Sequence, residues 1–342
     1  MTRIVVDAMG SDNYPTPDVE GAVLAAREYG VEVILVGDES KIKPILDEAY
    51  ARAGGATLPI RIVHAPEMLT MEDKGVALAL KARRPNAKNS MAVGMDLVKN
   101  GEADAFITMG NTGACLATAY FRLGTLTGVD LPTLAVAFPS ATGSFILVDL
   151  GANPDCKAEN LLQFAIMGSL YAEKVRGVNN PKIGLVSNGE EEGKGNALVK
   201  ASIPLLKTSG LNYIGCVEGK EVFSGSVDVA VMEGFTGNVF LKASEAVAKL
   251  LTDKIRETIT SGGLLTKIGG MLIKPAMSGV RKFLDPSEYG AATLLGVNGL
   301  VFIGHGRSDA RAVQVAVRVA KEACEANLLG AMKSAIEESL KK

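Results

Sequence analysis

Cysteine and histidine are scarce in this sequence of 342 residues, which has four cysteines and two histidines. The histidines, His64 and His305, show no metal-ligand spacing. The cysteines occur singly, without a CxxC pair, at Cys115, Cys156, Cys216 and Cys324. The sequence therefore predicts neither a metal site nor a disulfide framework, and a reducing cytoplasm suits it best.

Strong charge and long apolar runs are absent as well. The formal net charge is -2, whereas general nucleic-acid binders are usually strongly basic. No uninterrupted apolar stretch reaches the ~18 residues of a membrane-spanning helix, and no signal-peptide pattern precedes the first apolar run. We expect a cytoplasmic protein that binds no nucleic acid.

Three common ligand-binding and catalytic motifs are also missing. The chain has no GxGxxG fingerprint after its first apolar run, no GxxxxGK[ST] P-loop and no GxSxG elbow. A serine hydrolase is therefore disfavoured. A dehydrogenase is disfavoured less strongly, because dehydrogenases of the isocitrate type lack the dinucleotide fingerprint too.

What the sequence does contain is an alternation of apolar strand-like runs and helical patterns. This alternation indicates an α/β fold, in three α/β/α layers, with a mostly parallel sheet covered by helices on both faces. Hydrophobic residues make up 47% of the chain and no Pro/Ser linker divides it, so residues 1–342 are predicted to form one domain. Strands are predicted at residues 3–7, 31–37, 60–63, 104–108, 133–138, 145–149, 182–186, 228–232 and 300–304.

Two helix starts can also be predicted. Thr16 is expected to be the N-cap of a helix whose first residue is Pro17. Ser308 is expected to open a long helix, rich in alanine and valine, that ends at about Ala326. Ligands in such sheets bind outside the carboxyl ends of the strands, so function is sought in the loops that follow them.

These strand-end loops are rich in glycine and asparagine. Their backbone N–H groups can approach an anion, and a helix that starts there favours negative charge. One such turn is more often structural than functional, but six in one chain favour a phosphate-bearing ligand. The expected substrate- and phosphate-binding residues are Asp7, Gly10, Asp12, Gly110, Asn111, Thr112, Gly113, Asp149, Asn153, Gly189 and Gly237.

Two of the loops share one spacing. Asp104 and Asp228 are each followed, five residues later, by a Gly-x-Thr-Gly turn, at 110–113 and 234–237. The repeat reflects either two similar strand-to-helix turns or two loops that converge on one ligand.

Three polar side chains are candidates for catalysis. Lys194, in an acidic loop flanked by glycines, can neutralise a phosphate or an oxyanion, or else it is a solvated lysine paired with nearby glutamates. Asn238 can donate hydrogen bonds, although asparagine is also common in turns. His305 can polarise a carbonyl or shuttle a proton, or be a structural residue at a strand end.

Taken in order, these loops resemble the PlsX family of bacterial phosphate acyltransferases over nearly the whole chain. The most specific matches are GNTGA at 110–114, DLGAN at 149–153, GEE and KGN within 189–196, and GFTGN at 234–238. Three positions depart from the family pattern. Leu131 stands where arginine is usual, Glu233 stands where aspartate is usual, and GAAT at 290–293 replaces GGAP.

The resemblance implies transfer of a fatty acyl group from acyl carrier protein to inorganic phosphate in phospholipid synthesis, without a cofactor. It also implies a fold similar to phosphate acetyltransferases and isocitrate/isopropylmalate dehydrogenases, a homodimer and peripheral membrane contact, where a membrane glycerol-3-phosphate acyltransferase is a candidate partner. Phosphate is itself a nucleophile, so the protein has to position it and stabilise the oxyanion. We assign Lys194 and Asn238 to that stabilisation and His305 to acid/base chemistry or carbonyl polarisation.

Residues 258–284 contain basic residues and no acidic residue. We expect a protruding amphipathic segment, broken into short helices by glycines and Pro275, that contacts anionic lipid or the acidic carrier protein. An ordinary amphipathic helix pair, packed on the core or across a dimer, is the alternative. The residues assigned to this docking surface are Leu264, Lys267, Ile268, Met271, Leu272, Lys274 and Arg281.

Two rival functions stay open at this stage. A phosphate acyltransferase that uses coenzyme A thioesters predicts a nucleotide pocket and needs no carrier protein. A non-catalytic membrane-associated scaffold for lipid enzymes predicts normal function after Lys194→Ala.

Overall fold

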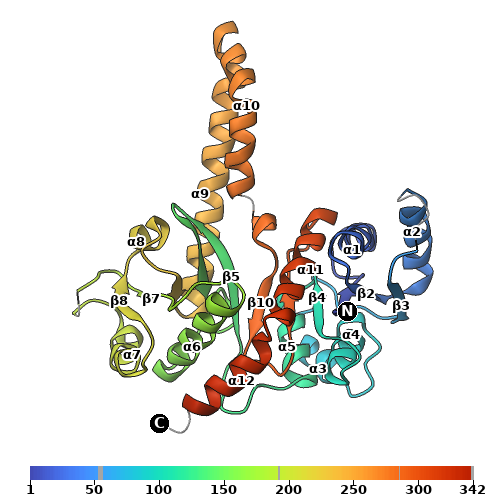
Figure 1. The fold of residues 1–342 in the computed structure, drawn as a ribbon, viewed down its shortest axis with the longest axis horizontal. Coiled ribbons are helices and arrows are strands. Elements are labelled where there is room, and N and C mark those ends of the chain that lie inside the picture. The colour runs from blue at the N-terminus through green and yellow to red at the C-terminus, as the bar shows by residue number, and fades with distance from the viewer. Residues whose placement is uncertain (53–56, 192, 285, 340–342) are drawn as a thin grey trace.

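The computed structural model describes residues 1–52, 57–191, 193–284 and 286–339, apart from the side chains at positions 281, 282, 284, 286 and 287. The described chain forms a single sheet with helices on both faces, which confirms the predicted α/β class (Figure 1). Its strands are β1 (Arg3–Asp7), β2 (Glu32–Gly37), β3 (Ile60–His64), β4 (Ala105–Thr108), β5 (Thr133–Ser140), β6 (Gly143–Val148), β7 (Ile183–Val186), β8 (Tyr213–Val217), β9 (Val229–Val231), β10 (Ala292–Leu295) and β11 (Val301–Ile303).

The sheet consists of two parallel groups that run in opposite directions. The strand order is β3-β2-β1-β4-β11-β10-β5-β6-β9-β7-β8. Strand β10 is antiparallel to both β11 and β5, and β5 is antiparallel to β6, so the direction reverses in the middle of the sheet. The carboxyl ends of β1, β4 and β11 therefore lie at one edge, and those of β6, β9, β7 and β8 lie at the other. The two Gly-x-Thr-Gly turns, which follow β4 and β9, consequently lie at opposite edges.

Each face of the sheet has its own set of helices (Figure 1). One apolar cluster joins the first face to α1 (Thr16–Tyr29), α2 (Glu39–Arg52), α6 (Ala158–Lys174), α7 (Ala197–Thr208), α11 (Ala310–Glu325) and α12 (Leu328–Ser339). Two further clusters join the other face to α3 (Gly75–Arg83), α4 (Ser90–Lys99), α5 (Thr112–Arg122), α8 (Gly219–Ser224) and α9 (Gly234–Ser261).

The structure corrects both predicted helix starts. Thr16 is already the first residue of α1, and Pro15 occupies the N-cap position without a side-chain hydrogen bond. Asp309, not Ser308, caps α11, since its Oδ1 accepts a hydrogen bond of 2.9 Å from the backbone N–H of Ala312. An aspartate and a serine serve equally well at this position, so the sequence alone did not decide between neighbours.

Helices α9 and α10 (Leu264–Leu284) form a hairpin that projects from the body of the molecule (Figure 1). The prediction of short, broken helices was wrong, because α10 is one helix of 21 residues that contains Gly269, Gly270 and Pro275. Gly270 packs against the side chain of Ile259, where a β-carbon would collide. This packing against α9 overrides the low helix propensity of glycine and proline. Chain direction reverses only at Gly262 and Gly263.

Candidate active site

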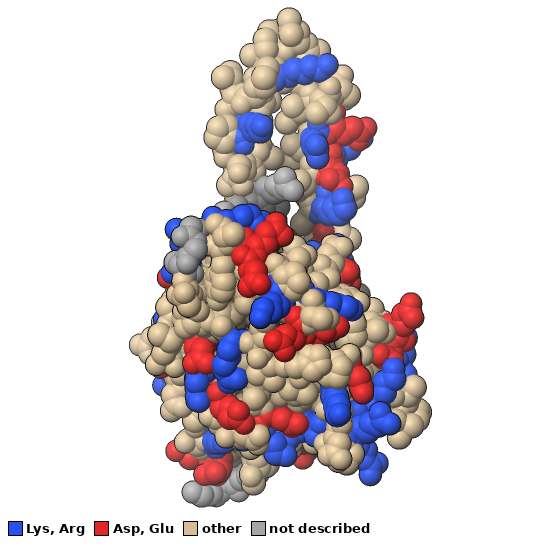
Figure 2. Space-filling model, turned by 90° about the vertical axis from the view of Figure 1, so that its right-hand side faces the viewer, with Lys and Arg blue, Asp and Glu red and all other residues tan. Residues whose placement is uncertain are grey.

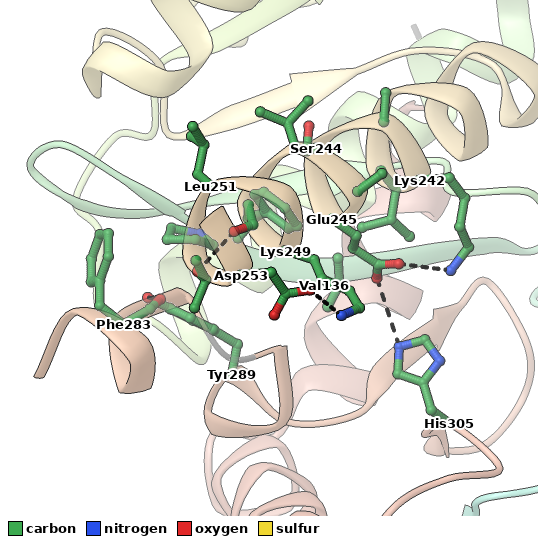
Figure 3. A pocket seen from close by; sticks show the side chains of 18 of the residues that line it. Val136, Lys242, Ser244, Glu245, Lys249, Leu251, Asp253, Phe283, Tyr289 and His305 are labelled. Atoms are coloured by element: carbon green, nitrogen blue, oxygen red, sulfur yellow. Dashed lines mark hydrogen bonds and ion pairs between the residues drawn. The ribbon is translucent and has the colours of Figure 1, made fainter. Parts of the chain in front are cut away.

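A cavity of about 1970 Å³ lies between the middle of the sheet and the hairpin, and its lining extends along α9 as far as Thr260. Its floor includes Leu134, Val136 and Phe138, which alternate along β5 with Ala135 and Ala137 on the opposite face. Its apolar walls come mainly from the hairpin and include Leu241, Ala248, Leu251, Ile255, Ile259, Met271 and Phe283. Figure 3 shows Val136, Leu251 and Phe283 around the hollow, with Lys249 and Asp253 among them and with Lys242 and Glu245 beside His305.

Helix α9 connects the two edges of the sheet along this cavity. Its first turn packs on the turn after β6, where a β-carbon at Gly151 would lie 3.5 Å from the side chain of Asn238. About one turn further on, Lys242 pairs with Glu245, and Glu245 itself approaches His305, which follows β11 at the other edge. Residues Asn238 and His305 therefore line one cavity although their strands end at opposite edges.

The Gly110–Gly113 turn closes one end of the cavity at the start of α5. The side chain of Asn111 caps α5 by accepting a hydrogen bond of 3.1 Å from the N–H of Ala114. Its amide also donates hydrogen bonds of 3.0 Å to the carbonyl oxygens of Thr70 and Asp73. Asn111 thus holds two loops together, and the helix N-terminus itself is the anion-attracting feature here.

A second cavity of about 480 Å³ opens beside this turn. It shares Thr112, Gly304 and His305 with the larger cavity. Lys74 also lines it, as does Asp73, whose carboxylate is paired with Lys81. A lysine, a histidine and a helix N-terminus around one small hollow suit a phosphate group.

Asp7, Gly10 and Asp12 support this end of the site from beneath. Asp7 is buried and accepts hydrogen bonds from the N–H of Met9 at 3.1 Å and from the hydroxyl of Thr108 at 2.7 Å. Burial raises the pKa of Asp7, and these hydrogen bonds oppose that rise. A β-carbon at Gly10 would lie 2.7 Å from Thr108 Oγ1. The N–H of Asp12 donates a hydrogen bond of 2.6 Å to the carbonyl of Gly306, beside His305.

Asp149 and Asn153 shape the turn at the other end. The carboxylate of Asp149 accepts hydrogen bonds from the N–H groups of Gly151, Ala152 and Asn153, at 3.1, 2.9 and 2.9 Å. Burial raises the pKa of Asp149, against the opposing effect of these bonds. The amide of Asn153 donates to Asp149 at 2.9 Å and to the carbonyl of Pro132 at 2.7 Å. Both side chains are committed to the protein rather than turned to the cavity.

Lys194 and Gly189 lie in the loop after β7, at the same edge as Asn238. The side chain of Lys194 is exposed and covers Gly189, where a β-carbon would lie 2.6 Å from Lys194 Cγ. The residues that line the two cavities include none from the described part of this loop. The geometry therefore does not bring Lys194 to the hollow that Asn238 and His305 share.

No role was predicted from the sequence for two cavity residues, Lys242 and Glu245. The ammonium group of Lys242 lies 3.0 Å from Glu245 Oε2, and Glu245 Oε1 lies 4.0 Å from Nε2 of His305. Partial burial lowers the pKa of His305; Glu245 opposes this effect, and Lys242 and Arg307 add to it. An i, i+3 Lys–Glu pair is ordinary on a helix surface, so only the fold reveals that this pair faces a histidine.

Three parts of the sequence depart from the family pattern, at Glu233, at Leu131 and at residues 290–293, and the structure places each of them. Glu233 caps α9, since its Oε1 accepts a hydrogen bond of 3.1 Å from the N–H of Thr236 and another from the Thr236 hydroxyl. Leu131 is partly buried against the core and is not a lining residue of either cavity. Gly290 and Ala292 line the larger cavity.

The residues assigned to docking divide between two sides of α10. Lys267 and Lys274 line the cavity together with Met271. Leu264 and Leu272 are 75% and 77% exposed, and Ile268 is 41% exposed. Arg281 belongs to α10, but its side chain is outside the described ones.

The described helices include none that is long and apolar enough to cross a membrane. No group of three or more His, Cys, Asp or Glu side chains is placed to hold a metal ion in the part of the chain that the structure describes.

Sequence comparison gives matches along nearly the whole chain. Residues 2–330 match the model of a family described as "Fatty acid synthesis protein". A phosphate acyltransferase of Acidobacterium capsulatum is 47% identical over 322 residues, which cover 94% of this chain and 93% of the relative. A phosphate acyltransferase of Pelotomaculum thermopropionicum is 45% identical over 335 residues, which cover 98% and 95%.

Similar solved structures support the predicted fold. A phosphotransacetylase from Streptococcus pyogenes superposes with a TM-score of 0.57 at 16% identity, covering 94% of both chains. A 4-hydroxythreonine-4-phosphate dehydrogenase described from Salmonella typhimurium gives 0.53 at 14% identity, covering 94% of this chain and 98% of that one. At these identities the likeness concerns the fold, and it confirms the expected relation to acetyltransferase-like and dehydrogenase-like architectures.

Proposed function

The chain belongs to the family of fatty acid synthesis proteins that includes bacterial phosphate acyltransferases, and on this premise we propose that it transfers a long-chain fatty acyl group from acyl-[acyl carrier protein] to inorganic phosphate. The observation that carries the proposal is the cavity. Its part along the hairpin is lined by many apolar side chains as well as by charged ones, and its other end holds His305, Lys242 and Thr112 at the start of α5.

The apolar part of the cavity suits an acyl chain. Each methylene that leaves water contributes about 0.8 kcal/mol, so a long chain gains far more than a short one from the walls formed by Leu241, Leu251 and Ile255. An acetyl group would use little of this surface. The proposed donor is therefore a long-chain thioester.

The polar end suits phosphate and the developing oxyanion. A phosphate oxygen attacks the thioester carbonyl carbon, the tetrahedral oxyanion collapses, and the carbon–sulfur bond breaks to give acyl phosphate and the free carrier thiol. The proton of hydrogen phosphate ends on the sulfur, so the step needs no further reactant. Asn238 and Lys242 are the proposed stabilising groups, the start of α5 holds phosphate, and His305 moves the proton. Lys194, near the same edge as Asn238, is kept as the alternative cation.

The test is incubation with palmitoyl-loaded acyl carrier protein, with and without phosphate. The expected result is phosphate-dependent loss of the thioester, with a hydroxylamine-reactive acyl phosphate as product. Equal loss without phosphate would identify a thioesterase instead. Replacing the donor by palmitoyl-coenzyme A separates the carrier-dependent enzyme from the rival, because strict dependence on coenzyme A thioesters rejects the proposed donor.

The proposed setting is the cytoplasmic face of an anionic membrane, where a membrane glycerol-3-phosphate acyltransferase consumes the labile product. Exposed leucines at the end of the hairpin support this setting, with Leu264, Leu265 and Leu272 at 75%, 85% and 77% exposed. Figure 2 shows this end of the hairpin with basic but no acidic side chains in that view. An interfacial segment combines these two properties.

The proposed assembly is a homodimer, as the family resemblance implies. Apolar side chains along α9 that do not line the cavity, such as Phe235, Val239 and Leu250, are 66%, 54% and 67% exposed, which is unusual for a surface that stays in water. Sedimentation equilibrium measures the mass directly. A monomer at micromolar concentration would reject this part of the proposal without affecting the reaction.

A further inference from the structure

The side chain of Glu245 has one carboxylate oxygen that is buried and lacks a hydrogen-bond partner among the described residues. That atom, Oε1, lies 4.0 Å from Nε2 of His305, while the other oxygen is 3.0 Å from the ammonium group of Lys242. The Glu245 side chain is 16% exposed, so water does not readily take the place of a partner. A buried, unpaired carboxylate oxygen is costly, and an approach of about 1 Å would make His305 its partner.

Close packing of the backbone on both sides of His305 restricts the orientation of its imidazole ring. A β-carbon at Gly304 would collide with the sulfur of Met109, and one at Gly306 would lie 2.5 Å from Asp12 Oδ1. The carbonyl of His305 accepts a hydrogen bond of 2.9 Å from the N–H of Ser308. The loop therefore has little freedom, and the adjustment that closes the 4.0 Å gap falls to the two side chains.

We infer that Glu245 is a positioning residue that binds the Nε2–H of His305 and so leaves Nδ1 as the proton-accepting nitrogen of the ring. A carboxylate accepts hydrogen bonds only, so its partner nitrogen must carry the proton. Such a carboxylate fixes both the tautomer and the orientation of an imidazole. Lys242 holds the carboxylate in place and partly balances its charge.

The inference rests on the proposed function and adds a role to it. Nδ1 of His305 takes the proton that hydrogen phosphate loses on attacking the carbonyl, and returns it to the departing sulfur of the carrier. The charges that act on the imidazole are Glu245 and Lys242 from α9 and Arg307 from its own loop. Asp73, which is paired with Lys81 at 2.5 Å, and Lys74 lie across the smaller cavity.

The chain has only two histidines, so the test can observe His305 directly. His64 is exposed, and its Nδ1 accepts a hydrogen bond from the N–H of Glu39, outside both cavities. In a His64→Gln background, ¹⁵N NMR of the full chain reports the pKa and the tautomer of His305 alone. Glu245→Gln should lower that pKa, since a carboxylate near an imidazole raises it, and should increase the fraction protonated at Nδ1.

Glu257→Gln is the matched control. Glu257 lies on the same helix and forms the same kind of i, i+3 pair, 3.1 Å from Lys254, but it is not a lining residue of either cavity. It should leave both NMR readings of His305 unchanged. Thermal unfolding of each variant confirms that the fold is kept, and Glu245→Asp tests whether a carboxylate on a shorter side chain restores the tautomer in part.

Turnover adds a second readout. With palmitoyl-loaded carrier, Glu245→Gln should lower kcat about 10- to 100-fold, leave KM nearly unchanged and move the acidic limb of the pH profile to lower pH. An unchanged pKa and tautomer in folded Glu245→Gln would overturn the inference. The NMR measurement needs no turnover. If the protein shows no acyltransferase activity, the proposed reaction is refuted, and the NMR data still decide whether Glu245 positions His305.

Discussion

Gly237 packs directly on the main-chain carbonyl oxygen of Asp149, so closely that a β-carbon at position 237 would overlap that oxygen. Gly237 belongs to the first turn of α9, and Asp149 follows the end of β6. The contact joins the two elements that carry Asn238 and the Asp149–Asn153 turn. The glycine is thus needed for close approach of two backbones, not for a positive φ.

Gly237→Ala should destabilise the protein by about 1–3 kcal/mol or more, because a backbone oxygen cannot move aside as a flexible side chain can. Thermal unfolding measures the loss. Gly263→Ala is the control, since a β-carbon there meets no atom within 4 Å. Equal unfolding midpoints for the two variants would show that the α9–β6 contact is looser than described.

Asn238→Ala should lower turnover about 10²–10³-fold, the usual cost of losing one preorganised oxyanion donor. Asn238 lines the cavity from the first turns of α9, and its truncation leaves the capping interaction of Glu233 intact. The midpoint of thermal unfolding should therefore change little. Steady-state kinetics with and without saturating phosphate would measure the effect, and near-normal turnover would remove Asn238 from the proposed mechanism.

Lys242→Ala and Lys194→Ala compare the two candidate cations. Lys242 lines the cavity, whereas Lys194 is exposed outside it, so we expect the larger loss of turnover for Lys242→Ala, on the order of 10²-fold. Each variant should unfold near the wild-type temperature. If only Lys194→Ala loses turnover on that scale, the stabilising cation is Lys194, as predicted from the sequence, and not Lys242.

The sequence predicted the fold better than the arrangement of the site. Apolar runs identified most strands, but β8 and β10 were missed. The pairing of β5 with β6 mattered more than these misses. The two antiparallel pairings of β10 cancel each other, so it is the antiparallel β5–β6 pair that sets the two parallel groups in opposite directions. Without that reversal, loops after parallel strands were expected at one edge, where Lys194, Asn238 and His305 would have met.

Several candidate residues were found for the right reason but in a different role. Glycine and asparagine do mark the strand ends, yet the side chains of Asn111 and Asn153 bind backbone carbonyls of neighbouring segments, Thr70 and Pro132 among them. Turn-forming asparagine and ligand-binding asparagine look alike in a sequence. Glu245 was missed because its importance depends on His305, sixty residues later, and on no local pattern.

The stability of the protein should fall as pH rises from about 4 to 7 on account of Asp18. Burial raises the pKa of Asp18 to about 7, and Asp7 nearby adds to the rise. Over this range the native state keeps a proton that the unfolded chain releases, so unfolding becomes easier as pH increases, by no more than about 4 kcal/mol.

Asp18→Asn removes this titration while an amide oxygen can still accept the hydrogen bond that Ser11 donates at 2.6 Å. The unfolding midpoint of the variant, relative to wild type, should rise steadily between pH 4 and pH 7. Midpoints measured by circular dichroism at several pH values test this. Parallel curves for the two proteins would mean that Asp18 is ionised in the native state.

The last prediction concerns the far end of the hairpin. Wild-type protein should sediment with anionic vesicles, and combined Leu264→Ser, Ile268→Ser and Leu272→Ser should abolish this. The three side chains are 75%, 41% and 77% exposed, so they contribute little to the folded core and their replacement should preserve the fold. Their insertion into the interface would be lost, since each buried aliphatic side chain contributes about 1.5–3 kcal/mol.

Val76→Ser combined with Leu80→Ser is the matched control, because these side chains are 78% and 64% exposed on α3, away from the hairpin. This variant should sediment like wild type.

Lys267→Glu with Lys274→Glu should weaken vesicle binding by about 1 kcal/mol for each lysine removed, and the loss should shrink in neutral vesicles or at high salt. If the same variant also binds acyl carrier protein less tightly, the hairpin serves both partners. If wild-type protein ignores anionic vesicles and the charge reversals leave carrier affinity unchanged, the exposed leucines belong to a protein–protein contact, and the membrane setting proposed here is wrong.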